Sequence, residues 1–240
     1  MGSPIVLSVK VGRVLAARHF KLATVESCLR VKLLRYLAGL LVFLLATTVT
    51  PAQHYEAGQA VADIITSPSD DRDYLAHRLK NGLRVLLISD PHTDKAAAAL
   101  DVRVGSGSDP EERPGLAHLL EHMLFLGTER YPEAGGYQAF IQLHGGSDNA
   151  YTMPDHTNYY FDIQSQFLRG ALERFSQFFV APLFNPRFIE RERGIVHAEF
   201  STKLQSDGRR YLAARRQAFD PRHPESGFAV GNENTLADRE

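Results

Sequence analysis

The chain has 240 residues, of which 44% are hydrophobic and 23% charged, and its single cysteine is Cys28. This composition excludes a disordered tail, a fibrous repeat, a disulfide framework and a thiolate metal site. The formal net charge of −1 conceals an asymmetry, because residues 1–52 carry seven basic residues and one acid, which leaves a net charge of −7 on residues 53–240. Such an acidic body has no positive field for phosphates, so we expect no nucleic-acid partner.

The N-terminal part of the chain contains the pattern of an export signal. Lys32 and Arg35 precede eleven uncharged residues, 36–46, and small residues then lead to Ala52. A basic region, an apolar stretch and a small-residue cleavage site are typical of a secretory signal peptide, which we predict at residues 31–52. The stretch is shorter than the roughly 20 residues that span a bilayer, so we expect no permanent membrane anchor. A buried core helix is the alternative.

About thirty residues precede this signal, which is unusual for a bacterial export sequence. We therefore predict that translation starts at Val31, through a GTG codon read as Met, and that residues 1–30 are a mis-annotated extension. Residues 53–73 are polar and acidic and are expected to lead into a folded domain at residues 74–240. Cleavage after the signal would place the mature protein outside the cytoplasm, in the periplasm of a Gram-negative bacterium and otherwise secreted.

The body of the chain shows strands in a run and then helices that pack one face. Asn81 and Gly82 between two apolar runs are the strongest short signal for a β-hairpin, and Pro114 stands where a helix would begin. The predicted strands cover residues 74–79, 83–89, 96–105, 149–153 and 158–164, and the predicted helices cover residues 115–126, 136–144, 167–179 and 186–219, the last interrupted near Asp207 and Gly208. This order favours an α+β fold, an antiparallel sheet packed by helices, over alternating α/β.

The predicted helix at residues 115–126 carries His118, Glu121 and His122 among apolar side chains. Residues four apart lie on one helix face with Cβ atoms about 5–6 Å apart, so the two imidazoles can bind one metal ion. Zinc accepts nitrogen and carboxylate ligands, and Glu121 at the edge of that face can act as the general base toward a metal-activated water. H-x-x-E-H is the inverzincin signature. Two surface histidines are the alternative interpretation.

Several segments around this motif resemble the pitrilysin and insulin-degrading-enzyme (insulinase) family of zinc metalloproteases. The similar segments are residues 115–128 (GLAHLLEHMLFLGT), 130–132 (RYP), 145–152 (GGSDNAYT), 156–162 (HTNYYFD), 171–175 (ALERF) and 190–199 (ERERGIVHAE). The resemblance covers about residues 74–238 and implies the N-terminal catalytic domain of such an enzyme, a zinc metalloendopeptidase with Zn²⁺ as its cofactor.

The resemblance also implies a role for individual residues. It implies that His118 and His122 are zinc ligands and that Glu199 is the third ligand. It also implies that Glu121 is the general base and that Glu192 is a carboxylate that orients a ligand histidine. Without the resemblance, Glu192, Glu190 and Asp162 are open alternatives to the third ligand, and each alone is more often a solvated charge. We expect no zinc ligand among the other histidines considered, His77, His92, His144, His156 and His197.

Substrate contacts are implied for the strand that follows the second helix. The resemblance suggests that Asn149 and Ala150 pair with the substrate backbone as an added strand, which would hold the scissile bond over the metal. Phe125 is expected to line the pocket beside this strand, with a plain core position as the alternative.

Members of the family that the chain resembles are far longer, with four homologous domains or two paired subunits around a chamber. We therefore expect a fragment, a truncated product or one half of a heteromer, with a peptide or small unfolded protein as substrate and a C-terminal half or paired subunit as partner. The favoured function is an exported zinc-dependent metalloendopeptidase domain. The alternative is a truncated non-catalytic remnant or subunit that binds zinc or peptide and needs a C-terminal half for activity.

Overall fold

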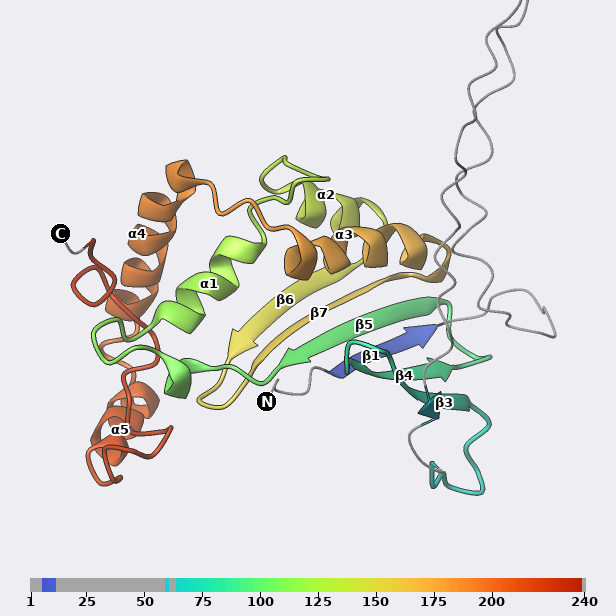
Figure 1. The fold of residues 1–240 in the computed structure, drawn as a ribbon, viewed down its shortest axis with the longest axis horizontal. Coiled ribbons are helices and arrows are strands. Elements are labelled where there is room, and N and C mark those ends of the chain that lie inside the picture. Colours follow the sequence, from blue (N-terminus) through green and yellow to red (C-terminus); the bar gives the residue numbers. More distant parts are fainter. Residues whose placement is uncertain (1–5, 12–58, 61–63, 239–240) are drawn as a thin grey trace, which may run out of the picture.

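The computed structural model describes residues 6–11, 59–60 and 64–238, which form one sheet with helices over one of its faces (Figure 1). The strands are β1 (Val6–Val11), β2 (Gln59–Ala60), β3 (Asp73–Arg78), β4 (Arg84–Ser89), β5 (Lys95–Val102), β6 (Ser147–Thr152) and β7 (Thr157–Gln164), in the order β2-β3-β4-β1-β5-β7-β6. The helices are α1 (Leu116–Leu124), α2 (Gly136–Leu143), α3 (Leu168–Val180), α4 (Pro186–Thr202) and α5 (Asp207–Arg216), with short 3-10 turns at Ser106–Ser108 and Ser165–Phe167.

The α+β fold and the main elements expected from the sequence are confirmed. The hairpin of β3 and β4 turns at Gly82, whose φ of +89° suits a residue without Cβ. The helix predicted at residues 186–219 is interrupted slightly earlier than expected. Its first part, α4, ends at Thr202, and its second part, α5, begins at Asp207. Asp207 opens the second helix and does not break the first, since an acidic residue in a first turn complements the helix dipole.

Strand β1 occupies the middle of the sheet. It pairs in parallel with β4 and antiparallel with β5, so these two successive strands do not pair with each other. This strand lies within the extension predicted at residues 1–30, whereas the predicted signal peptide lies outside the described residues. The translation start at Val31 stays a prediction. Among the helices of the described residues, none is long and apolar enough to cross a membrane.

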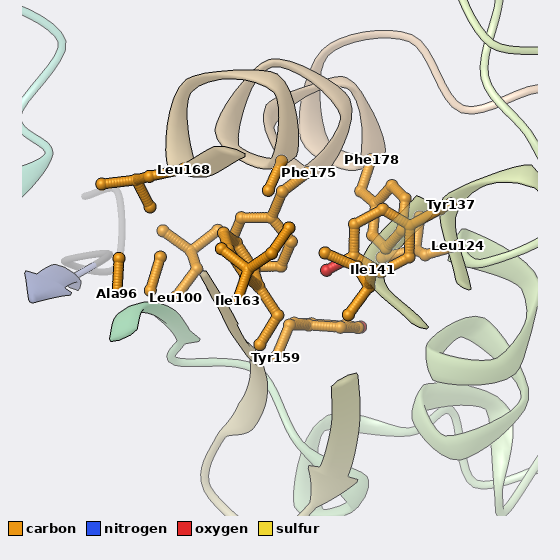
Figure 2. Packing of buried hydrophobic residues seen from close by; sticks show 13 residues of the cluster. Ala96, Leu100, Leu124, Tyr137, Ile141, Tyr159, Ile163, Leu168, Phe175 and Phe178 are labelled. Atoms are coloured by element: carbon orange, nitrogen blue, oxygen red, sulfur yellow. The ribbon is translucent and has the colours of Figure 1, made fainter. Parts of the chain in front are cut away.

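The main core lies between the sheet and helices α2 and α3 (Figures 1 and 2). Alternate residues of β5 and β7 are buried on this face, and they meet aromatic side chains of α3. The most buried members are Ala96, Ala98, Tyr159, Phe161, Ile163, Ile141, Ala171, Phe175 and Phe178. Each large apolar side chain buried here contributes roughly 1.5–3 kcal/mol, so this layer is a rigid base for the loop and helix that follow β5.

A second, smaller cluster joins α1 to α4. Leu119 and Met123 from α1 pack against Val196 of α4, and Leu236 of the C-terminal segment closes the cluster. Their exposed fractions lie between 0% and 8%. Because residues three and four apart share a helix face, this packing also fixes which polar side chains of the two helices lie opposite each other.

Candidate active site

The start of α1 is fixed by one carboxylate outside the helix. Asp109 accepts hydrogen bonds from the backbone N–H groups of Gly115 (2.7 Å) and Ala117 (2.8 Å), two donors that the helix itself leaves unpaired. Burial raises the pKa of Asp109, and these backbone hydrogen bonds oppose the rise. Gly115, with φ +96°, precedes the first helical residue. The helix therefore begins at a defined rotation, which sets the direction of the side chains one turn later.

Three side chains from α1 and α4 converge on one point. Nε2 of His118 lies 3.5 Å from Oε2 of Glu199, and Nε2 of His122 lies 3.9 Å from the same oxygen. The ligand atoms of all three lie within 4.8 Å of one another, the one such group of histidine, cysteine and acidic residues among the described positions. Two donors bound tetrahedrally to zinc, each about 2.1 Å from the ion, lie about 3.4 Å apart. The donor set and its spacing therefore fit Zn²⁺.

Both histidines are held through their other ring nitrogen. His118 Nδ1 donates to the backbone carbonyl of Val230 at 2.8 Å, and His122 Nδ1 donates to Oε2 of Glu192 at 3.4 Å. Because both partners are acceptors, each Nδ1 carries a proton, which leaves Nε2 as the ring nitrogen that could bind a metal. The two rings are nearly perpendicular, at 87°.

Glu192 is buried, with 5% of its surface exposed, and its second oxygen is also paired. Oε1 accepts from Nε (3.0 Å) and Nη2 (2.8 Å) of the neighbouring Arg191. The carboxylate thus bridges a guanidinium and an imidazole, an arrangement that orients the ring of His122. The contact with His122 is compatible with the role expected for Glu192, which stays a prediction.

Glu199 presents one oxygen to the histidines and the other to a lysine. Lys203, one turn further along, donates from Nζ to Oε1 of Glu199, so Oε2 is the oxygen that faces the two imidazoles. Burial acts to raise the pKa of Glu199, but the hydrogen bond from Lys203 and the nearby His118 and His122 outweigh it and hold the pKa below its ordinary value. The side chain is therefore a carboxylate anion at neutral pH, the form that ligates a metal.

Glu121 lies beside the triad without belonging to it. It has 7% of its surface exposed, and its Oε2 accepts a hydrogen bond of 2.5 Å from Oγ1 of Thr152, the last residue of β6. Thr157 stands 3.4 Å from the same hydroxyl and gives its own proton to the carbonyl of Val104. Strand β6 is thereby attached to α1 at the carboxylate.

The alternatives left open for the third ligand lie elsewhere. Glu190 pairs with Arg193 on an exposed part of α4, and Asp162 on β7 pairs with Lys95 and accepts from the hydroxyl of Ser147. Neither belongs to the group of three. Residue spacing along the chain did not identify which of these carboxylates is the third ligand, because it does not show which turn of α4 faces α1.

The side chains expected at the substrate divide between two environments. Asn149 and Ala150 lie on β6, at the edge of the sheet, and the N–H of Ala150 donates to Oδ1 of Asn149 at 2.9 Å. Phe125 is half-buried and its ring centroid lies 5.1 Å from that of Phe178, which places it against the main core. A substrate contact by Phe125 stays a prediction.

The other five histidines considered do not join the triad. His144 stacks on Phe167, His156 contacts Asp155, and His197 contacts Ser201 and Glu233.

Sequence reasoning missed three groups that touch the site. They are the carbonyl of Val230, the hydroxyl of Thr152 and the ammonium of Lys203. No sequence signal could have identified Val230, because every residue has a backbone carbonyl. Lys203 did have a signal, because it follows Glu199 by four residues and such pairs meet on a helix.

The motif and the triad place this site in the inverzincin class of metal centres. The family model described as Insulinase (Peptidase family M16) matches residues 84–218, more than half of the chain. The chain belongs to this family. The expected cofactor is confirmed as well, since the triad offers the donors that zinc prefers and a relative is named as a zinc protease.

Similar proteins are far longer than this chain. It is 48% identical to insulin-degrading enzyme of Mus musculus and 51% identical to that of Drosophila melanogaster, each over 176 residues; both matches cover 73% of this chain, and 17% and 18% of the relative. A putative zinc protease of Caenorhabditis elegans is 47% identical over 173 residues, which cover 72% of this chain and 20% of that protein. The crystal structure of pitrilysin matches with a TM-score of 0.72 and 41% identity, over 77% of this chain and 20% of that chain. The chain thus spans a fifth or less of their length.

Proposed function

We propose that this chain is the zinc-binding part of an exported metalloendopeptidase that hydrolyses peptides. The observation that carries the proposal is the convergence of His118, His122 and Glu199 beside Glu121, whose carboxylate is outside the triad and held by a hydrogen bond. Nothing in this arrangement depends on a thiol or a hydroxyl nucleophile. The site has the functional groups that hydrolysis by a metal-activated water requires, a set of metal ligands and a carboxylate that can act as a base.

In this proposal His118, His122 and Glu199 would hold Zn²⁺ through the atoms that face one another, Nε2 of each histidine and Oε2 of Glu199. When bound, the ion supplies Lewis acidity and lowers the pKa of a water toward about 7. The chain supplies the rest: Glu192 and the carbonyl of Val230 hold the two imidazoles in the required tautomer, and Lys203 leaves one oxygen of Glu199 free.

Glu121 is the proposed general base. Its carboxylate accepts a proton from the attacking water, whose oxygen forms a bond to the carbonyl carbon of the substrate. The carbon–nitrogen bond then breaks, and the proton passes from Glu121 to the leaving amine. The hydrogen bond from Thr152 fixes one carboxylate oxygen, which leaves the other for this transfer.

The edge strand β6 is the proposed substrate-binding element. Edge strands have unpaired backbone groups that an extended peptide can pair with, and β6 ends at the residue that contacts Glu121. A peptide added beside Asn149 and Ala150 would run toward the triad.

The partner of this chain in the proposal is a C-terminal half or a paired subunit. The support is the length of the relatives, of which this chain covers 17% to 20%. Export rests on the signal-like pattern of residues 31–52, which the structure does not describe.

The test uses the full chain with an unstructured fluorogenic peptide. We expect one equivalent of bound zinc, cleavage that a chelator abolishes and zinc restores, and no cleavage by Glu121→Gln with its zinc retained. One equivalent of zinc without cleavage, even after addition of a C-terminal half, would support the non-catalytic remnant. Absence of bound zinc would refute the metal centre.

A further inference from the structure

We propose that residues 230–236 form a positioning element that sets the orientation of His118, and with it the affinity of the site for zinc. The proposal rests on the metal centre of the proposed function. It concerns a segment that carries none of the ligands and lies more than one hundred positions from the motif on α1.

The contact itself is a hydrogen bond from His118 Nδ1 to the carbonyl of Val230, at 2.8 Å. A carbonyl only accepts, so this bond fixes a proton on Nδ1 and leaves Nε2, the ring nitrogen that faces Glu199, as the atom that would bind a metal. It also favours one orientation of the ring, because the acceptor belongs to the backbone and cannot change rotamer as a side chain can. His118 thus depends on the path of the main chain at Val230.

That path is set by a direct contact between two glycines. A Cβ built on Gly115 would lie 2.2 Å from Cα of Gly231, and one built on Gly231 would lie 2.8 Å from Cδ1 of Leu236 and 3.2 Å from Cα of Gly115. Both residues have positive φ, +96° and +81°, which glycine adopts without strain. The two backbones therefore touch, one residue away from Val230 and one helical turn before His118.

The segment is anchored on its other side by packing and by a turn. Leu236 has 2% of its surface exposed and packs against Leu119 and Met123 of α1. The backbone N–H of Thr235 donates to Oδ1 of Asn232, and the N–H of Asn232 donates to Oγ1 of Thr235, which closes the turn between the two contacts. The carbonyl of Val230 is therefore held from both directions along the chain.

The two histidines are consequently supported in different ways. His122 relies on a side chain of α4, the carboxylate of Glu192, whereas His118 relies on backbone brought from the C-terminal segment. Loss of such an outer contact to a metal ligand typically lowers metal affinity by about 10- to 100-fold. Displacement of residues 230–236 is expected to have an effect of this size while every ligand remains.

The experiment compares Gly231→Ala with Gly227→Ala in the full chain. Gly227 is exposed, and a Cβ there would meet nothing within 4 Å, so it is a matched control four residues away. Zinc affinity is measured by competition with a chelator, and the ligand geometry by the visible absorption of the Co²⁺-substituted protein. We expect Gly231→Ala to weaken zinc binding by about 10- to 100-fold and to alter the Co²⁺ spectrum, and Gly227→Ala to change neither.

A second pair of variants separates positioning from general destabilisation. Leu236→Ala releases the anchor without adding an atom, and Leu168→Ala removes the same side chain from the main core, away from the C-terminal segment. We expect Leu236→Ala to weaken zinc binding and Leu168→Ala to leave it unchanged, with far-UV circular dichroism to confirm that each variant is folded.

The outcomes distinguish the two proposals. If the wild-type chain binds no zinc, the metal centre and this inference both fail. If it binds zinc and both Gly231→Ala and Leu236→Ala bind it as their controls do, the metal centre stands and the positioning role of residues 230–236 is overturned. If Gly231→Ala does not fold, the comparison of Leu236→Ala with Leu168→Ala decides.

Discussion

Thr152 Oγ1 donates a hydrogen bond of 2.5 Å to Oε2 of Glu121, so the last residue of the edge strand β6 holds the carboxylate that lies beside the triad of His118, His122 and Glu199. The proposed base and the proposed substrate strand are therefore joined by one contact. Movement of β6 relative to α1 would disturb both.

Thr152→Val tests this contact, because valine keeps the shape and removes the hydroxyl. A hydrogen bond to a charged group is worth about 1.5–3 kcal/mol, so we expect peptide cleavage to fall by about 10- to 100-fold. Zinc stoichiometry should be unchanged, since the hydroxyl of Thr152 is hydrogen-bonded to Glu121, which lies outside the triad. Thr152→Ser retains the hydroxyl and should restore most of the activity; equal activity of the valine variant would remove Thr152 from the mechanism.

Glu199→Ala is expected to abolish stoichiometric zinc, because it removes the carboxylate that forms a group of three with the two imidazoles, the one such group among the described residues. Glu190→Ala is the matched control on the same helix, since Glu190 is exposed and pairs with Arg193. Metal content after dialysis, measured by atomic emission, distinguishes them. Retention of a full equivalent by Glu199→Ala would mean that another group completes the site.

Glu192→Gln is expected to lower zinc affinity by about 10- to 100-fold while the protein stays folded. The amide keeps the shape of the buried side chain but loses the charge that faces His122 and Arg191. A chelator competition titration measures the effect, with Glu190→Gln as the control. Unchanged affinity would show that Glu192 serves only the packing of α4.

Asp109→Ala is expected to destabilise the fold by about 1–2 kcal/mol, because the N–H groups of Gly115 and Ala117 lose their acceptor. For a domain of this size the shift in Tm is about 2–4 °C for each kcal/mol. Thermal unfolding followed by circular dichroism measures it, with the exposed Glu111→Ala as control. An unchanged Tm would mean that the start of α1 is fixed by packing alone.

Local features of this chain could be predicted from sequence, and long-range contacts could not. The hairpin at Asn81 and Gly82 and the helix of the H-x-x-E-H motif depend on turn chemistry and on spacing, which are local. The contact of Val230 with His118 and the insertion of β1 between β4 and β5 depend on pairing between distant segments. No residue pattern encodes such pairing, because a strand's own alternation is the same whatever its neighbour is.

The choice of Glu199 shows the same limit within one helix. Glu190, Glu192 and Glu199 all lie on α4, and the packing of Val196 against α1 determines which of them lies near Nε2 of both histidines. The resemblance to a known family supplied that information at the level of sequence. To select Glu199 on physical grounds, the placement of α4 relative to α1 must be known.

The position of β1 links the first residues of the chain to the order of the sheet. Removal of residues 1–52 would take β1 away and leave the backbone N–H and C=O groups of β4 and β5 facing a vacant strand position. The five residues that connect β4 to β5 have a length that hairpins use, so the two strands could then close on each other. The 240-residue chain and a chain without residues 1–52 would thus differ in sheet order, and protection of the β4 and β5 amides from hydrogen exchange would report which form is present.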